Sequence, residues 1–300
     1  MNSISVVIPV FNGSHSLSEL YSRLVNILQQ MAVPFEIIMV DDASKDDSFE
    51  VMQNLRQHDK RVGIIKLEKN YGQHAATLCG LAQSRGDYII TIDDDLQHLP
   101  EAIPDLMKKI TEGYDAVFAI FENKQHSFYR NLGSDFMNLT LNIIFNKPRS
   151  VRTSSYRILT GRLANIMKEH DQANVYLAAL IFKNTSKVAN ISVEHQKRQY
   201  GQSNYNYYRL LKLARTLFYN YSNLPILFTL ILWIVAFVMY RFVKINDFLN
   251  SSIIVMSLIL LVPAIISIRV IITYYKLRIL ARRFPAYTIH SIDMEEGELI

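Results

Sequence analysis

The sequence predicts an α/β domain with a mostly parallel sheet, followed by two apolar helices long enough to cross a membrane. Three observations predict this class. Short apolar runs alternate with stretches of helical periodicity through the first two thirds of the chain, as in parallel strands joined by helices. Polar residues follow the ends of these runs. Residues 223–275 then carry few charged side chains, which indicates membrane-spanning segments.

The first strand is predicted at 4–10, an apolar run that ends before the turn-forming residues Asn12, Gly13 and Ser14. A helix is predicted next. Ser16 and Glu19 have the spacing of a capping box, and apolar residues then recur at helical spacing along one face.

The same unit repeats as far as residue 92. Further strands are predicted at 35–40, 63–67 and 88–92, and helices begin near residues 46 and 72. Strands that alternate with helices of this length imply a mostly parallel sheet.

In an open sheet of this kind, ligands bind outside the carboxyl ends of the strands. Each of the four predicted strands ends in polar residues. They are Asn12 after the first strand, Asp41 and Asp42 after the second, Asn70, Tyr71 and Gly72 after the third, and Asp93, Asp94 and Asp95 after the fourth. One such aspartate would be an ordinary helix cap, whereas four polar strand ends together indicate a site.

The three adjacent carboxylates at 93–95 are the strongest signal. Like charges side by side are unfavourable unless a cation or hydrogen-bond donors compensate. Hard divalent cations prefer carboxylate oxygens and leave positions open for substrate phosphates. The alternative is a solvated acidic turn before a helix that begins near Pro100. The other polar strand ends favour a metal and diphosphate site.

Asp41 and Asp42 are candidates for binding a nucleoside, because a carboxylate at a strand end can accept hydrogen bonds from a base and from a ribose hydroxyl. The alternative is a helix start capped by Ser44 or Asp46. Both interpretations can hold together if Asp46 is the cap and the other two aspartates remain for the ligand.

Several other classes of site do not match. The first turn lacks the G-x-G-x-x-G pattern of dinucleotide-binding folds, and the chain has no P-loop. A nucleotidyltransferase would be expected to have a glycine-rich phosphate cradle after the first strand, which is missing. His74 and His98 have no partners at metal-ligand spacing and are expected to be surface or supporting residues.

The overall composition fits a domain beside a membrane. The net charge of +5 is modest and concentrated late in the chain, which suits a membrane surface or phosphate-bearing substrates better than a nucleic acid. Cys79 is the only cysteine, so no intramolecular disulfide can form and a cytoplasmic domain is expected. The start of the chain lacks the signal-peptide pattern, so membrane insertion is expected to come from the C-terminal segments.

Residues 201–222 are expected to form an amphipathic interfacial helix that is basic and aromatic. Spans are predicted at 224–240 and 248–268. Basic residues precede the first span and follow the second, and the positive-inside tendency then places both termini and the catalytic domain in the cytoplasm. A multi-pass protein of the inner (cytoplasmic) membrane is therefore expected.

Four segments carry a family resemblance in combination: IPVFN at 8–12, VDDAS at 40–44, NYGQHAA at 70–76 and DDDLQHLPE at 93–101. Together they resemble the large inverting family-two glycosyltransferases of GT-A fold. More narrowly, they resemble the branch of dolichyl-phosphate mannose synthase and bactoprenol glucosyltransferase. The resemblance extends over roughly the whole chain, because RQYGQSNY at 198–205 and the paired apolar helices also fit that branch.

The resemblance implies roles for individual residues. The residues expected to bind the nucleotide sugar are Pro9, Phe11, Asn12, Asp41, Asp42, Asn70, Gly72, Asp93 and Asp94. Asp94 stands where the family often has alanine, and the resemblance defines no role for it. Asp93, Asp95 and Gln97 would hold Mg²⁺ or Mn²⁺ against the diphosphate. The expected catalytic residues are Asp93, Asp95, Arg130, Arg157 and Arg198. The three arginines match basic positions expected near phosphates, and guanidinium groups bind phosphate oxygens in a bidentate way.

Two positions depart from the family pattern. Ser155 lies where many relatives have an aspartate before an aromatic–arginine pair, and Asn204 lies where a lysine is frequent. The first departure removes a candidate general base. A phosphate acceptor is already anionic near neutral pH and needs no base, so the departure favours a phospholipid acceptor over a hydroxyl.

The resemblance thus implies inverting sugar transfer from a nucleotide diphosphate sugar to a polyprenyl phosphate of undecaprenyl or dolichyl type, for cell-surface glycan modification. Two alternatives stay open: a transferase that extends a lipid-linked glycan or polysaccharide on a sugar hydroxyl, and a degenerate membrane-anchored binding protein. The expected partners are the nucleotide sugar, the polyprenyl phosphate and the membrane, without nucleic acid; a homo-oligomer is compatible with the sequence.

The expected division of the chain is a catalytic domain at 1–200, the interfacial helix at 201–222, two transmembrane helices at 223–275 and a basic and acidic cytoplasmic tail at 276–300.

Overall fold

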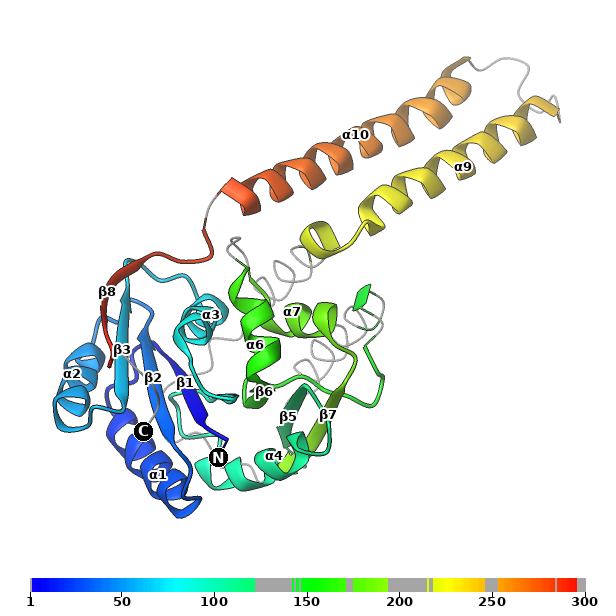
Figure 1. Ribbon diagram of the computed structural model, residues 1–300. Helices are drawn as coiled ribbons and strands as arrows, with labels where there is room; N and C mark the ends of the chain where they lie inside the picture. Colours follow the sequence, from blue (N-terminus) through cyan, green and yellow to red (C-terminus); the bar gives the residue numbers. More distant parts are fainter. Residues whose placement is uncertain are drawn as a thin grey trace. The chain divides into compact units, whose positions relative to one another are not determined.

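The computed structural model describes residues 2–121, 142, 144–145, 147–170, 175–193, 215, 218–245, 253–283 and 285–295, without the side chains of 242–245, 253–256 and 281–283 (Figure 1). The chain divides into two compact units. The first contains Met1–Tyr205 and Pro285–Ile300, and the second contains Asn206–Phe284.

The described part of the first unit is built on an eight-stranded sheet with the strand order β7-β5-β6-β4-β1-β2-β3-β8. The strands are β1 Ile4–Val10, β2 Phe35–Asp41, β3 Val62–Leu67, β4 Tyr88–Thr91, β5 Ala116–Phe121, β6 Arg157–Thr160, β7 Val188–Val193 and β8 Ile289–Asp293. β1, β2, β3 and β4 form parallel pairs, and β5 is parallel to β7, whereas β6 and β8 run antiparallel to their neighbours. The expected mostly parallel sheet is confirmed.

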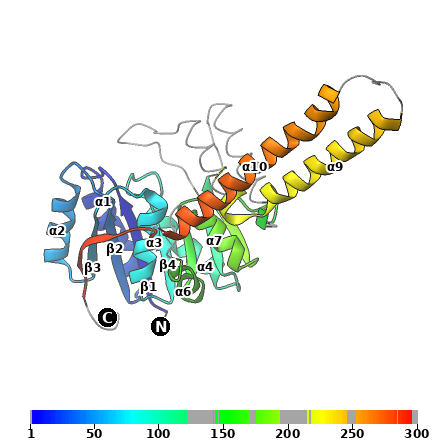
Figure 2. The same cartoon turned by 90° about the horizontal axis from the view of Figure 1, so that it is seen from above.

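Helices pack on both faces of the sheet (Figures 1 and 2). They are α1 Leu17–Gln30, α2 Ser48–His58, α3 Gln73–Gln83, the 3₁₀ turn η1 Pro100–Ala102, α4 Ile103–Ile110, α6 Gly161–Lys168 and α7 Leu177–Asn184. α1 packs with α2 and η1, and α3 packs with α6 and with β1 and β2.

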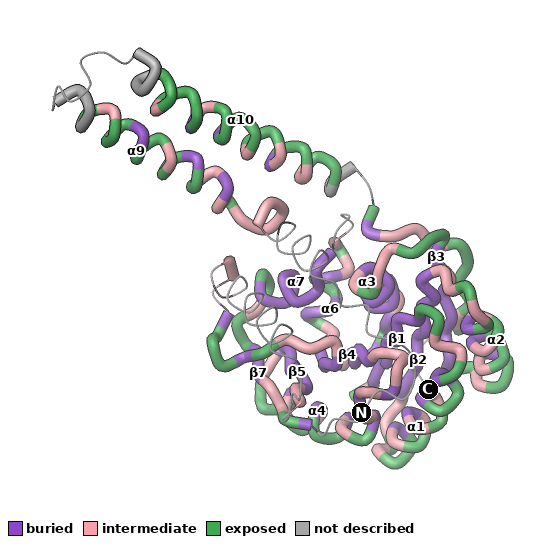
Figure 3. Tube along the Cα trace, turned by 180° about the vertical axis from the view of Figure 1, so that it is seen from behind, coloured by how far each residue is buried: buried purple, intermediate pink, exposed green. Residues whose placement is uncertain are grey.

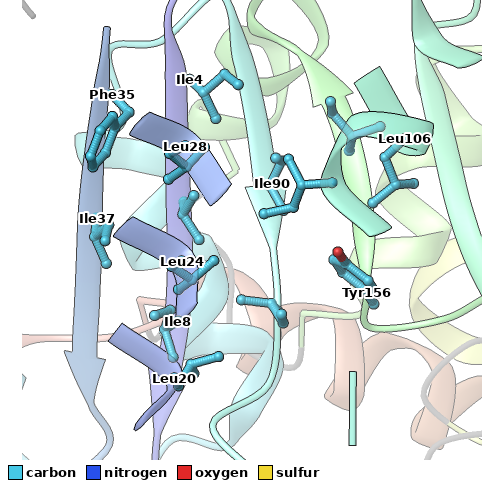
Figure 4. Packing of buried hydrophobic residues seen from close by; sticks show 14 of the residues in the cluster. Ile4, Ile8, Leu20, Leu24, Leu28, Phe35, Ile37, Ile90, Leu106 and Tyr156 are labelled. Carbon is cyan, nitrogen blue, oxygen red and sulfur yellow. The ribbon is translucent and has the colours of Figure 1, made fainter. Parts of the chain in front are cut away.

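The core of the unit lies between the central strands and α1. Leu20, Leu24 and Leu28 recur at helical spacing and are fully buried against Ile8 and Ile37 of β1 and β2, as Figure 4 shows. Burying each such leucine stabilises the fold by roughly 1.5–3 kcal/mol. The predicted amphipathic helix therefore fixes the position of the first strand and the loop that follows it.

The start of α1 differs from the prediction. Ser16 precedes the helix, but its side chain accepts no capping hydrogen bond. The Ser16 hydroxyl lies within hydrogen-bonding reach of two carbonyl oxygens, those of Gly13 and Asp94. The capping box is thus absent, and this serine connects the loop after β1 to the loop after β4.

The second unit contains the helices α9, Leu224–Ile245, and α10, Ile253–Arg283, which pack against each other. Their most apolar windows, Leu224–Arg241 and Ser257–Leu280, have mean hydropathies of 2.1 and 2.2, and only 17% of each window is buried. Figure 3 shows exposed residues along both helices. A core helix of a soluble domain would be mostly buried, so these helices are suited to crossing a membrane by length and composition.

The second apolar helix extends further than predicted. The prediction ends it at residue 268, before Arg269, whereas α10 continues past this arginine to Arg283. Near its end, Tyr274 donates a hydrogen bond to Asn223 (2.8 Å), and Arg278 donates to the carbonyl oxygens of Tyr219 and Ser222 (3.1 and 3.2 Å). The expected interfacial helix at 201–222 lies mostly outside the described residues.

The chain after α10 returns to the first unit. Residues 276–300 are expected from sequence to form a separate tail, but Ile289–Asp293 forms β8 and pairs with β3. A side chain at Gly63 on β3 would lie 2.9 Å from Met294, so the glycine leaves room for this segment. The segment 285–295 therefore belongs to the same unit as the sheet.

Candidate functional site

The loop after β1 holds three strand ends together. The backbone N–H of Phe11 donates to Asp94 Oδ2 (3.1 Å), which joins this loop to the end of β4. Asn12 N donates to Ser44 Oγ (3.0 Å), and Asn12 Oδ1 accepts from Lys45 N (2.8 Å), which joins the same loop to the end of β2. The polar residues at these strand ends lie around β1, where the strand order reverses and where ligands of open sheets bind.

Three of the four described non-glycine residues with a left-handed φ lie in the same three loops. Asn12, Ala43 and Leu96 have φ of 55°, 58° and 58°, in the left-handed region. Such a conformation costs on the order of 1–3 kcal/mol for a residue other than glycine, and it persists where the surrounding contacts enforce it. Strain of this kind is common at binding sites, because the backbone conformation there serves the ligand and not the stability of the loop.

The carboxylate of Asp93 is held by side chains from two other elements. Asp93 Oδ1 accepts a hydrogen bond from Gln73 at the start of α3. Asp93 Oδ2 accepts from the hydroxyl of Ser155, just before β6, at 2.6 Å. The orientation of this carboxylate is therefore fixed by residues far away in the sequence.

The hydrogen-bond network around Asp93 continues to a buried arginine. Thr91 Oγ1 donates to the carbonyl oxygen of Ser155 (2.6 Å) and accepts from Arg157 Nε (3.1 Å). Arg157 is only 3% exposed, and its guanidinium carbon lies 6.0 Å from the centre of the Phe118 ring. Burial lowers the pKa of Arg157 to about 10, against the opposing effect of Asp93. The guanidinium therefore stays charged at neutral pH.

Asp94 connects the acidic loop to the loop after β1. Burial raises the pKa of Asp94 to about 7, and the neighbouring carboxylates of Asp93 and Asp95 add to this effect, while the N–H of Phe11 opposes it. A Cβ atom at Gly13 would lie 2.4 Å from Asp94 Oδ2. A larger residue at this position would displace the Asp94 carboxylate, which supports the loop through its hydrogen bond with Phe11 N.

The metal-ligand residues expected from sequence are partly brought together. Asp93, Asp95 and Gln97 are half-buried on one loop, where Asp95 Oδ1 accepts the backbone N–H of Gln97 (3.2 Å). Among the described residues, no group of three or more His, Cys, Asp or Glu side chains is arranged to hold a metal. Two carboxylates with hard oxygen donors fit Mg²⁺ or Mn²⁺ when phosphate oxygens supply further ligands.

Asp41 and Asp42 have different roles at the end of β2. Asp42 Oδ1 and Oδ2 accept the backbone N–H groups of Tyr71 and Gly72 (2.7 and 2.8 Å), and burial raises the pKa of Asp42. Asp41 Oδ1 accepts from Ser44 N (3.0 Å), but its buried Oδ2 has no hydrogen-bond partner among the described residues. A buried carboxylate oxygen without a partner is costly, so Asp41 is the better candidate for a ligand contact.

The remaining predicted residues occupy several environments. Phe11 is 44% exposed at the end of β1, whereas Pro9 is buried within that strand and pairs with Val40. Asn70 Nδ2 donates to the carbonyl oxygen of Asp42 (3.2 Å). Arg130 and Arg198, as well as Asn204, lie outside the described residues.

The two histidines have packing contacts. His98 is buried and stacks on Phe121, with 5.2 Å between the ring centres. The His74 ring meets Tyr176 edge-on at 4.9 Å, and burial together with Arg157 lowers the pKa of His74 to about 4. His74 is therefore neutral at physiological pH.

Sequence reasoning did not assign roles to Gln73, Thr91 and Tyr71. Gln73 is the first residue of α3, directly after Gly72, whose φ of 90° favours glycine. A polar residue that follows such a glycine at a strand end is the one local signal for this group. Thr91 gives no such signal, because a threonine at the end of a strand is common.

The chain is similar to known proteins along most of its first unit. The family model described as glycosyl transferase family 2 matches residues 5–176. The undecaprenyl-phosphate 4-deoxy-4-formamido-L-arabinose transferases of Salmonella choleraesuis and Salmonella typhimurium are each 34% identical to this chain over 214 residues. The match covers 71% of this chain and 65% of each relative, which is less than two thirds of their length.

Solved structures share the fold at lower sequence identity. Glucosyl-3-phosphoglycerate synthase from Mycobacterium tuberculosis in complex with Mn²⁺, uridine diphosphate and phosphoglyceric acid has a TM-score of 0.53 at 16% identity, covering 72% of this chain and 76% of that chain. Its complex with phosphoglyceric acid has a TM-score of 0.54 at 17% identity, covering 72% and 77%. The expected GT-A-type α/β fold is confirmed by this likeness.

Proposed function

The chain belongs to glycosyl transferase family 2, and from this membership we propose that it transfers a sugar from a nucleotide diphosphate sugar to a polyprenyl phosphate. The observation that carries the proposal is the position of Asp41 and Asp93 at the ends of β2 and β4, the two neighbours of β1. Asp41 has a buried oxygen without a partner among the described residues, and Asp93 with Asp95 offers oxygen ligands. A nucleoside bound at Asp41 would give its free oxygen a hydrogen-bond partner, and a metal ion with the diphosphate would use the oxygens of Asp93 and Asp95.

In this proposal the nucleoside lies beside the loop after β1. The half-exposed ring of Phe11 offers an apolar face on which a base can stack. Asp41 accepts a hydrogen bond from the base or the ribose, while Asp42 keeps the loop at 70–72 in place through its two backbone hydrogen bonds. Asn12 contributes mainly by linking the loops after β1 and β2.

Asp93 and Asp95, with Gln97, would hold Mg²⁺ or Mn²⁺ at the diphosphate. The ion, when bound, would neutralise charge on the leaving diphosphate. Gln73 and Ser155 keep the Asp93 carboxylate in one orientation. Arg157 remains charged in its buried position and adds a favourable field for phosphate oxygens.

A phosphate acceptor fits the environment of Ser155. Its hydroxyl donates to Asp93, which gives it a positioning role and not the role of a base. A phosphate oxygen that is already anionic can attack the anomeric carbon while the bond to the diphosphate breaks on the opposite face, so no protein group needs to remove a proton. The curated relatives are named undecaprenyl-phosphate transferases, which supports the choice of a polyprenyl phosphate.

The membrane arrangement follows from the two units. If α9 and α10 both cross a bilayer, the segments before and after them return to the same side, and both segments contribute to the first unit. The basic residues that flank the helices favour the cytoplasm. We therefore propose an inner-membrane protein with a catalytic domain at 1–200, an interfacial helix at 201–222, two spans within 223–275 and a tail at 276–300 whose last part completes the catalytic unit.

The proposal is tested with the full chain in lipid nanodiscs, using UDP- and GDP-linked sugars, undecaprenyl phosphate and either Mg²⁺ or Mn²⁺. The expected product is a sugar linked to the lipid phosphate, formed only with a divalent ion and abolished by EDTA. Transfer to the sugar hydroxyl of a lipid-linked glycan, but not to the lipid phosphate, would favour an extending transferase. Nucleotide binding without any transfer would indicate a binding protein.

A further inference from the structure

Residues 288–293, which follow α10, are joined to the catalytic unit by backbone and side-chain contacts. β8 pairs with β3 from Ile64↔Asp293 to Leu67↔Ile289, with an irregularity between Lys66 and Leu67. At the far end, Asp293 forms an ion pair with Arg56 (3.1 Å). At the near end, the carbonyl oxygen of Thr288 accepts from Glu68 N (3.1 Å). Thr288 therefore lies at the end of β3 where the strand gives way to the loop at 70–72.

The Thr288 side chain bridges two residues of that loop region. Its hydroxyl donates to Glu68 Oε2 (2.5 Å), and it also lies 2.5 Å from the hydroxyl of Tyr71. A threonine hydroxyl has one hydrogen, and an ionised carboxylate only accepts. Tyr71 must therefore donate to Thr288, which donates to Glu68, so that the three groups form one directed chain of hydrogen bonds.

Tyr71 transmits this contact to both ends of the proposed site. Its own backbone N–H donates to Asp42, as does that of Gly72. The next residue, Gln73, begins α3 and donates to Asp93. Residues 71–73 therefore contact three places. The Tyr71 side chain contacts Thr288 of the tail, and the N–H groups of residues 71 and 72 contact Asp42 at the nucleoside end of the site. Gln73 contacts Asp93 at the metal end.

We propose that Thr288 is a positioning residue for nucleotide binding and acts through Tyr71. This inference rests on the proposed function. The tail's hydroxyl fixes the Tyr71 ring, the ring fixes the segment at 71–73, and that segment sets the directions of the Asp42 and Asp93 carboxylates. The segment beyond the second apolar helix would then contribute to the affinity for the nucleotide sugar, although Thr288 itself touches no substrate.

The test compares Thr288→Val, which has nearly the same shape but no hydroxyl, with Thr288→Ser, which keeps the hydroxyl. Binding of UDP and of GDP is measured by calorimetry with Mn²⁺ on the full chain in nanodiscs, and the nucleotide that binds is used. Thr288→Val should weaken binding about three- to tenfold, as expected for one net hydrogen bond. The KM for the nucleotide sugar should rise by the same factor, while kcat and the KM for the lipid stay within about twofold. Thr288→Ser should restore binding.

Tyr71→Phe provides an independent measurement, because it removes the other hydroxyl of the same bond. It should weaken nucleotide binding by a similar factor, and the double variant should be no worse than Thr288→Val alone, since Tyr71→Phe removes a hydrogen bond that Thr288→Val has already removed. His290→Ala, at an exposed position of β8, is the matched control and should bind like the original chain.

The outcomes separate this inference from the function on which it rests. If the original chain binds neither UDP nor GDP, the proposed function is overturned. If it binds and Thr288→Val binds equally well, the positioning role is overturned. If Thr288→Val does not fold, Tyr71→Phe decides alone, and unchanged affinity in that variant overturns the inference.

Discussion

Asp93 and Asp95 lie two residues apart, yet their surroundings differ. Asp93 accepts hydrogen bonds from Gln73 and Ser155, which belong to other parts of the fold, whereas Asp95 accepts the N–H of Gln97 in its own loop. The first carboxylate is thus oriented by the tertiary structure and the second by its local turn. If the two carboxylates hold a metal ion as proposed, Asp93 would be a ligand fixed by distant elements and Asp95 a ligand fixed by its neighbours.

Asp95→Asn should reduce metal-dependent transfer on the order of a hundredfold or more, because it keeps the shape of the side chain but removes a charge from the proposed ion site. The measurement is transfer as a function of Mn²⁺ concentration, with thermal unfolding as a check on folding. Asp105→Asn, an exposed position on α4, is the control and should behave like the original chain. Normal transfer with unchanged metal dependence in Asp95→Asn would remove the metal assignment.

Ser155→Ala should slow transfer about three- to tenfold, because Asp93 loses one of its two orienting hydrogen bonds. Ser154→Ala should cost less, since the Ser154 side chain accepts from the N–H of Tyr156 (3.2 Å) and has no hydrogen bond to Asp93 among the described residues. The pH profile of the rate should keep its shape in both variants, because neither serine removes a proton. Inactive Ser155→Ala protein with an altered pH profile would instead favour a hydroxyl acceptor and a proton-accepting site.

For single residues, the sequence predicts which side chains lie at the strand ends but not which residues form hydrogen bonds with them. Asp41, Asp42 and Asp93 each follow an apolar run, and that local pattern is sufficient to place them at one edge of a parallel sheet. Ser155 approaches Asp93 only because β6 pairs antiparallel with β4. No local pattern in the sequence contains that pairing, and so the network of Gln73, Thr91 and Ser155 appears only in the structure.

Among the elements, α3 packs against β1 and β2, and Gly80 lies at this contact. A Cβ atom at Gly80 would lie 2.4 Å from Val7 Cγ1 on β1 and 3.2 Å from Val40 Cγ2 on β2. The close packing also sets the position of Gln73 at the start of α3. This glycine therefore links the packing of the sheet to the geometry of the site.

Gly80→Ala should destabilise the catalytic unit, because overpacking costs about 1–3 kcal/mol and exceeds the gain of up to about 1 kcal/mol that alanine brings to a helix. The check is the unfolding midpoint in urea. The matched variant is Val7→Ala, which removes Val7 Cγ1, the atom that the new methyl group would meet most closely. Gly80→Ala should cost less in that background, and an equal cost in both backgrounds would contradict the steric explanation.

The predicted elements agree with the structure up to residue 92 and are incomplete beyond it. β1, β2 and β3 are buried runs bounded by turn residues, and these properties can be recognised locally. β6 has only four residues, and β8 is largely exposed. Short or exposed strands lack a long apolar run, and their position depends on the edge or neighbour with which they pair.

At the scale of the whole chain, the anchor and the last strand of the sheet are on one continuous segment. Truncation after residue 222 therefore removes α9 and α10, and it also removes β8. The truncated unit should unfold at a lower temperature than the same unit in the full chain, by about 2–4 °C for each kcal/mol lost. An unchanged unfolding temperature would mean that β8 contributes little to stability.

A chimaera separates these two effects. Replacing residues 223–284 by a long glycine and serine linker retains β8 and should restore the unfolding temperature and nucleotide binding. Transfer to long-chain lipid should remain low in this chimaera, because the acceptor is no longer held near the site. Full transfer by the chimaera on nanodisc-embedded lipid would show that the apolar helices are dispensable for the reaction.

The pairing of β3 with β8 also concerns how the chain is made. It joins residue 64 to residue 293, so a ribosome completes β3 early and releases β8 only after both apolar helices have been synthesised. Until then the edge of β3 has no partner, and an open strand edge can pair with other chains. A molecule in which only one of the two helices crossed the bilayer would carry β8 on the opposite side from β3. Its sheet would stay incomplete, and correct insertion would thereby become a condition for finishing the fold.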